Sequence, residues 1–139
     1  MIFDKNNLMN ILPHRDAMLL IDEAQVIDGE ARARKLINSN EWFLQGHFPD
    51  NPIVPGVILC EILAQSVCVL FAQESSGKKI KTMLAGINNA RFKNPVRPGD
   101  IFETKCVILK QKPPFYWAQG SGFVNGKLCV SAEFSFVLG

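Results

Sequence analysis

The stretch that decides the fold reads GVILCEILAQSVCVLFAQ and covers residues 56–73. After Gly56 it contains no turn residue, and it is apolar on nearly every side, which predicts a buried helix rather than a surface helix. Pro55 suits the first turn of such a helix, where its missing N–H costs nothing. A helix that is apolar all round must be covered on most of its circumference. The rest of the chain is therefore expected to wrap around it.

Strand signals dominate the sequence outside this helix. Asn125-Gly126 is a strong hairpin signal. From Leu128 to Leu138 an apolar residue recurs at every second position, which indicates a strand with one buried face. The expected strands are 18–27, 30–37, 81–95, 101–111, 115–124 and 128–138, with a short helix over 7–12. The predicted fold class is α+β, a curved antiparallel sheet of about six strands around one long central helix.

Length and composition narrow the classes of protein further. The 139 residues suffice for a single domain, so residues 1–139 are expected to form one unit. Apolar residues make up 47% and charged residues 20%, which excludes a disordered chain. A net charge of +2 is too small to indicate nucleic-acid binding. No apolar run is long enough for a membrane span.

The cysteines and the first residues bear on the compartment. Cys60, Cys68, Cys106 and Cys129 form no C-x-x-C pair and have no nearby histidine, so no zinc site is expected. Each lies in an apolar run, where a reduced cysteine behaves as a small hydrophobe. The N-terminal residues show no signal-peptide pattern. Reduced thiols without an export signal predict a cytoplasmic protein.

Positive charge gathers in one segment. Residues 78–112 hold nine basic and two acidic residues, so this segment carries +7 in a chain of net charge +2. Such a cluster is either an ordinary solvated surface or a face that attracts an acidic partner. The candidate docking residues are Lys78, Lys79, Arg91, Lys93 and Arg97.

Glu61 is the anomaly of the central helix. A carboxylate in an apolar helix costs several kcal/mol unless it is paired or hydrogen-bonded. Burial raises the pKa of such a group and favours the protonated acid. Gln65 lies one turn further on the same helical face, where its amide can orient the carboxyl. The alternative is a glutamate that reaches water or the start of the helix.

Two further features lie just before and at the start of the helix. His47 is placed in a loop rich in Gly and Pro, which stiffens its backbone, and an imidazole suits proton transfer near neutrality. A surface histidine is the alternative. The first N–H groups of the helix, from Gly56 onward, have no partner within it and can stabilise an oxygen that becomes negative. A base, an acid and an oxyanion site without a nucleophile predict proton abstraction next to a carbonyl, followed by elimination.

Residues 46–65, GHFPDNPIVPGVILCEILAQ, closely resemble the active-site segment of the 3-hydroxyacyl-[acyl-carrier-protein] dehydratases of the FabZ type. That family's pattern is H-F-P-x-x-P-x-x-P-G-V-x-x-x-E-x-x-A-Q, and every fixed position is met. Residues 12–15 (LPHR) with 19–22, and residues 90–96 (ARFKNPV) with 98–100, resemble two further segments of the family. The chain departs from the family at Asp16-Ala17-Met18, where aromatic or proline residues are common.

The resemblance implies a hotdog fold and reversible dehydration of a (3R)-3-hydroxyacyl thioester to the trans-2-enoyl thioester. It implies that His47 and Glu61 form the catalytic pair, contributed by opposite subunits of a homodimer, and that such dimers commonly assemble as trimers of dimers. Gly56, with Val57 beside it, would bind the thioester oxygen, and Gln65 would support Glu61. The implied partner is acyl carrier protein, whose phosphopantetheine carries the substrate, so no separate cofactor is expected.

Three alternatives stay open at this level. One is a dehydratase that also isomerises the enoyl double bond; the sister type that does so has Asp in place of Glu61, which favours the simpler reaction. Another is a hotdog acyl thioesterase, and the third is a non-catalytic acyl-binding subunit. His14, within the LPHR segment, is expected to have a structural role, because nothing around it in the sequence supplies a partner.

Overall fold

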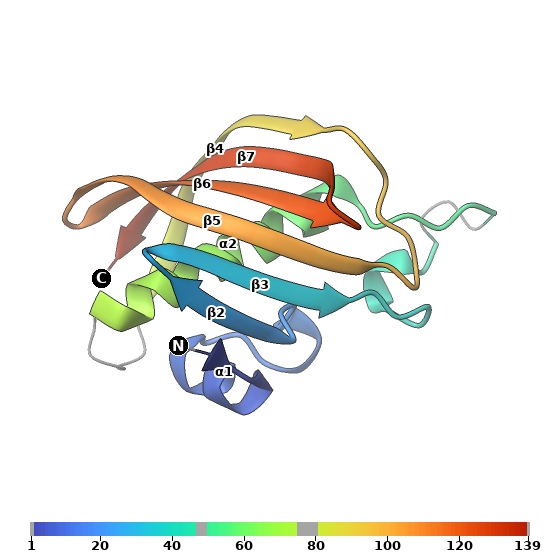
Figure 1. Ribbon diagram of the computed structural model, residues 1–139, viewed down its shortest axis with the longest axis horizontal. Coiled ribbons are helices and arrows are strands. Elements are labelled where there is room, and N and C mark those ends of the chain that lie inside the picture. The colour runs from blue at the N-terminus through green and yellow to red at the C-terminus, as the bar shows by residue number, and fades with distance from the viewer. Residues whose placement is uncertain (1, 47–49, 75–80, 139) are drawn as a thin grey trace.

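The computed structural model describes residues 2–46, 50–74 and 81–138. Its centre is helix α2 (Gly56–Glu74), and the sheet curves across it (Figure 1). The helix predicted over residues 56–73 is therefore confirmed to within one residue. Leu63, Val67 and Phe71 are fully buried. The helix fills the inside of the roll, as its apolar circumference requires.

One antiparallel sheet forms the wrapping layer, with the strand order β1-β2-β3-β5-β6-β7-β4. The strands are β1 (Ile2–Phe3), β2 (Glu23–Ile27), β3 (Glu30–Leu36), β4 (Thr82–Phe92), β5 (Ile101–Lys112), β6 (Phe115–Val124) and β7 (Lys127–Leu138). The described residues thus contribute seven strands where about six were expected. The additional strand, β1, has two residues and is too short to leave a periodic signal. The α+β class and the hotdog arrangement of sheet around helix are confirmed.

The segment before β2 differs from its prediction. A strand was expected over residues 18–27, but a 3-10 helix covers Asp16–Met18 and β2 begins only at Glu23. The side chain of Gln65 bonds to this segment: its Nε2 donates to the Met18 carbonyl at 2.8 Å and its Oε1 accepts from the Leu20 N–H at 2.9 Å. A side-chain amide thus supplies the partners that a neighbouring strand would have supplied. The other short helices are α1 (Lys5–Ile11) and a 3-10 turn over Trp42–Leu44.

The alternation predicted for the last strand is confirmed. Val130, Ala132, Phe134 and Phe136 are all buried on the face that meets α2. On β6 the buried face includes Gly122, where a Cβ would lie 2.1 Å from the fully buried ring of Phe102. Only a glycine allows that ring to lie so close to the backbone.

A chain of buried hydrogen bonds fastens α2 to the sheet. The Ser66 hydroxyl donates to the Ile62 carbonyl at 2.8 Å, and the Thr104 hydroxyl lies 2.9 Å from the Ser66 oxygen. The Ala33 N–H donates to the same Thr104 oxygen at 3.1 Å. These bonds join α2 to β5 and β3 and fix how the helix lies across the sheet.

Among the strands that the structure describes, β4 lies at an edge of the sheet and pairs only with β7. Most of its residues are exposed, including the large apolar side chains of Met83, Leu84 and Ile87. An exposed apolar edge strand is a ready template for pairing with another chain.

The four cysteines are free thiols, as the sequence indicated. Burial raises the pKa of Cys68 to about 12 and also raises the pKa of Cys106. Such thiols remain protonated and act as core side chains. Among the described residues, no helix has both the length and the hydropathy that a membrane crossing requires.

Candidate active site

Glu61 and Gln65 lie on the same face of α2, one turn apart. The Gln65 Nε2 donates to the Glu61 Oε1 at 3.1 Å, so the contact predicted from their spacing is present. Gln65 is fully buried, whereas the Glu61 side chain is 28% exposed. The amide is therefore fixed by the backbone of residues 18–20, and it orients a carboxyl that is open on one side.

His14 is the second neighbour of this carboxyl. Its Nε2 lies 3.5 Å from the Glu61 Oε1. The expectation that His14 lacks a partner is therefore wrong. The chain folds so that the segment after α1 crosses the face of α2 that carries Glu61, and this contact joins residues far apart in the sequence. The LPHR motif was the only sequence signal for the contact between His14 and Glu61, because no local pattern connects residues 14 and 61.

The ionisation of Glu61 also differs from the prediction. Burial by itself raises the pKa of this carboxyl, but the contacts with His14 and Gln65 outweigh burial. The net result is a pKa below the usual value of 4.5. Within a single chain Glu61 is thus favoured as a carboxylate, and burial alone does not keep it protonated.

The N-terminus of α2 offers free backbone donors. The Pro55 carbonyl accepts from the N–H groups of Ile58 and Leu59. Among the described residues, the N–H groups of Gly56 and Val57 find no acceptor. The ring of Phe92 packs so closely on Gly56 that a Cβ there would lie 2.8 Å from it. This is the second position where an aromatic ring lies close to a glycine backbone.

A cleft of about 440 Å³ opens beside these donors. It lies between the start of α2 and the end of β4, and Phe92 is 54% exposed at its edge. Val57 is 76% exposed, so the face of α2 that carries Glu61 is open at its N-terminal end and closed at Gln65. The cleft is lined by Ile53, Val54, Gly56, Leu59, Phe92, Lys93, Asn94 and Pro95.

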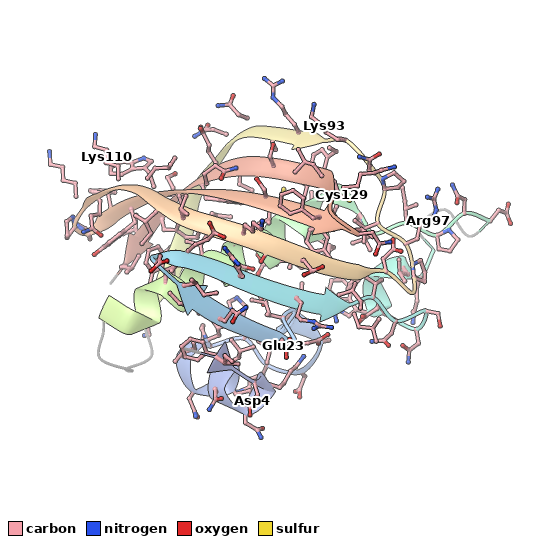
Figure 2. All side chains as sticks on the ribbon, in the orientation of Figure 1. Asp4, Glu23, Lys93, Arg97, Lys110 and Cys129 are labelled. Atoms are coloured by element: carbon pink, nitrogen blue, oxygen red, sulfur yellow. The ribbon has the colours of Figure 1, made fainter. Side chains whose placement is uncertain are left out.

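His47, the predicted base, lies outside the described residues. The predicted contact between His47 and Glu61 therefore stays a prediction. Of the predicted docking residues, Lys78 and Lys79 also lie outside the described ranges. Arg91, Lys93 and Arg97 are exposed along the end of β4 and the loop that follows it, and Figure 2 labels Lys93 and Arg97 on this side of the molecule.

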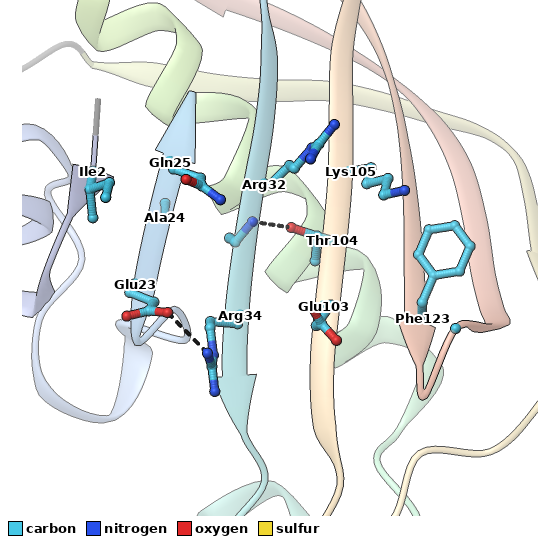
Figure 3. Close-up of a pocket in the computed structure, with 12 residues that line it drawn as sticks. Ile2, Glu23, Ala24, Gln25, Arg32, Arg34, Glu103, Thr104, Lys105 and Phe123 are labelled. Carbon is cyan, nitrogen blue, oxygen red and sulfur yellow. Dashed lines mark hydrogen bonds and ion pairs between the residues drawn. The ribbon is translucent and has the colours of Figure 1, made fainter. Parts of the chain in front are cut away.

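A larger hollow of about 590 Å³ lies elsewhere, on the outer face of the sheet (Figure 3). Charged side chains of both signs project into it from β2, β3 and β5, and the Arg34 Nη1 pairs with the Glu23 Oε1 at 3.2 Å. None of the candidate site residues lines this hollow. The larger hollow is therefore separate from the candidate site.

Comparison with known proteins shows which family the chain is similar to. The family model of the FabA-like domain matches residues 12–133. The 3-hydroxyacyl-[acyl-carrier-protein] dehydratase FabZ of Clostridium beijerinckii is 41% identical, and the similarity covers 96% of each chain. The protein of the same name from Staphylococcus haemolyticus is 40% identical over 99% of this chain and 96% of its own.

Among solved structures, the dehydratase heterocomplex ApeI:P from Xenorhabdus doucetiae superposes with a TM-score of 0.82. The sequence identity is 19%, and the match covers 95% of this chain and 90% of the other. The PaaI protein of the Escherichia coli phenylacetic acid degradation operon superposes with a TM-score of 0.63 at 15% identity, covering 82% of this chain and 80% of the other. At such identities these likenesses concern the fold alone.

Proposed function

Because the chain belongs to the FabA-like family, we propose that it catalyses the reversible dehydration of a (3R)-3-hydroxyacyl-[acyl-carrier-protein] to the trans-2-enoyl-[acyl-carrier-protein] in fatty acid biosynthesis. It is then a hydro-lyase. The observation that carries this proposal is the near full-length similarity to FabZ dehydratases, which includes the segment that bears Glu61, Gln65 and Gly56.

The proposed reaction divides the work among three groups. Neutral His47 removes a proton from the carbon next to the thioester carbonyl. The Gly56 N–H, at the positive end of α2, stabilises the enolate-like oxygen, and one such donor is typically worth about 3 kcal/mol. Glu61 delivers a proton to the departing hydroxyl. The open face of α2 beside Val57 supports this assignment, because a substrate has room to reach the carboxyl there.

The proposed assembly is a homodimer in which His47 of one chain faces Glu61 of the other, with three dimers forming a hexamer. The exposed edge of β4 supports the proposed dimer, with the second chain placed against this edge. The edge presents backbone groups available for pairing together with the apolar side chains of Met83, Leu84 and Ile87. Burial of these side chains would add the apolar area that a stable subunit interface needs.

Acyl carrier protein is the proposed partner, and its phosphopantetheine carries the acyl chain, so no separate cofactor is needed. The exposed cations Arg91, Lys93 and Arg97 lie next to the cleft at the start of α2 and supply charge complementary to an acidic carrier. We expect binding to weaken as salt rises, because exposed charges are screened. Unchanged carrier affinity after reversal of charge at Arg91 and Lys93 would exclude this docking face.

The test is turnover of a 3-hydroxyacyl thioester, followed by the absorbance of the enoyl product. The wild-type chain should form the trans-2-enoyl product, and folded His47→Ala and Glu61→Gln variants should lose most of the rate. Near-normal activity in either variant removes the role assigned to that residue. Product analysis separates the rivals: a shifted double bond indicates an isomerising dehydratase, and free thiol release indicates a thioesterase.

A further inference from the structure

Among the described residues, the carboxyl of Glu61 has partners on one oxygen only. Gln65 and His14 both contact Oε1, at 3.1 Å and 3.5 Å. No hydrogen bond or ion pair joins a described residue to Oε2. A carboxyl fixed through one oxygen presents the other to whatever enters the open side of the site. His14 is therefore one of the two groups that decide how this carboxyl points.

The segment that carries His14 is fastened from three directions. The Arg15 guanidinium donates to the carbonyls of Met9, Leu12 and His14 at 2.7–2.8 Å. The Trp42 Nε1 donates to the Ala17 carbonyl at 2.9 Å, and Gln65 bonds to the backbone at both Met18 and Leu20. An imidazole on so constrained a segment has little freedom to leave Glu61.

The described part of the chain brings few other charges to Glu61. On α2 the Cys68 thiol interacts with Glu61, and it is neutral because burial raises its pKa to about 12. Burial also raises the pKa of the Cys60 thiol. On the segment of His14, Arg15 is engaged with backbone carbonyls and Asp16 is exposed. Among the described residues, His14 is the group whose charge acts on Glu61. The proposed base His47 lies outside these residues.

The environment of His14 and the contact with Gln65 have opposite effects on where the proton of the His14–Glu61 pair resides. The His14 Nδ1 is buried and has no hydrogen-bond partner among the described residues. An imidazolium would leave the Nδ1–H unpaired, and this favours a neutral imidazole that keeps its proton on Nε2, with the extra proton of the pair on Glu61. The N–H that Gln65 donates to Oε1 favours the carboxylate and acts in the other direction. The geometry therefore suits a proton shared by both residues rather than fixed on one.

We propose that His14 is a positioning residue that acts through Glu61, and that these two residues together hold the proton delivered to the leaving hydroxyl. This inference rests on the proposed dehydration. Before reaction the pair carries one exchangeable proton. As the C–O bond breaks, that proton passes from Glu61 to the hydroxyl and water leaves, while His47 gains the proton from carbon. The pair is left as neutral imidazole and carboxylate, and solvent returns the proton from His47.

The experiment compares the pH dependence of kcat/KM for the wild-type chain and the His14→Gln variant. Glutamine keeps an N–H donor but cannot titrate, so Glu61 would lose its proton in the carboxyl range. We expect the alkaline limb to move down by at least about one pH unit, with a loss of about tenfold or more at pH 8 and a smaller change in KM. A profile that is lower but unshifted in pH would mean a merely structural role and would overturn the proposal.

Two additions keep the test decisive. Arg15→Gln loosens the same segment without removing the imidazole, and it should lower the rate without shifting the limb. A carbon NMR titration of the Glu61 carboxyl needs no turnover: the wild-type signal should show two inflections, and the His14→Gln or His14→Asn signal one. A single inflection in the wild-type chain refutes the coupling. If the wild-type chain shows the two inflections but forms no enoyl product, the proposed function fails and the coupling stands.

Discussion

Replacing Gln65 with leucine tests whether one amide holds both the fold and the site together. The side chain is fully buried and makes three hydrogen bonds, to the Met18 carbonyl, the Leu20 N–H and the Glu61 carboxyl. In Gln65→Leu, two backbone groups lose their partners, each at about 1–3 kcal/mol. The added apolar burial returns about 1–2 kcal/mol. We expect a net loss of about 0–5 kcal/mol in the free energy of unfolding, centred on about 2.5 kcal/mol.

Thermal and urea denaturation measure this loss. At about 4 °C per kcal/mol for a chain of this size, the central value corresponds to a fall in Tm of about 10 °C. Gln25→Leu is the matched control. Gln25 lies on the outer face of β2, and no hydrogen bond of its side chain to a described residue is broken by the change. The control should stay within about 0.5 kcal/mol of the wild type.

The reasoning fails if Gln65→Leu and Gln25→Leu have the same stability. Such a result would mean that residues 18–20 find other partners, in water or in the backbone, at no cost. It would also weaken the explanation given for the late start of β2, since that explanation depends on the amide of Gln65 supplying these bonds.

Three other perturbations follow from the packing and the charges. Thr104→Val removes the acceptor of the Ala33 N–H and the partner of Ser66, so the urea midpoint should fall by the equivalent of about 1–3 kcal/mol, whereas Thr104→Ser should retain most of the stability. Gly122→Ala places a Cβ against the buried ring of Phe102 and should lower the free energy of unfolding by about 1–3 kcal/mol or more. Gly56→Ala places a Cβ against the half-exposed ring of Phe92, which can move, so its loss in the same denaturation assay should be smaller. Equal losses would contradict this reasoning. Because the pKa of Glu61 is lowered on folding, its carboxylate stabilises the fold above about pH 4.5, and that contribution disappears as the pH falls further. The stability of the wild type relative to Glu61→Gln should therefore decline only in acid. A pH-independent difference would show that the pKa does not change on folding.

The central helix and the last strand could be predicted because each carries its own periodic signal. Apolar residues on every side of residues 56–73 exclude a surface helix, and the alternation from Leu128 to Leu138 states which face is buried. The segment around Leu20 could not be predicted in the same way. Its apolar run favours a strand, but its hydrogen-bond partner is a side chain on α2, and no local pattern records that.

In the candidate site, too, the contacts set by local spacing could be predicted and those made by the tertiary fold could not. Gln65 beside Glu61 follows from helical spacing, which is a local property. The lowered pKa of Glu61 depends on His14, which reaches it only through the tertiary fold. The sequence shows burial and the Gln65 contact but not the His14 contact, and burial acts in the opposite direction to the net change.

Gln65 fastens the segment after α1 through main-chain atoms of Met18 and Leu20, and this has a consequence for how the enzyme can diversify. Because neither contact involves a side chain of residues 16–18, Asp16, Ala17 and Met18 can be exchanged without disturbing the amide that orients the acid. The sequence of this stretch can then change while the proton-transfer geometry stays the same.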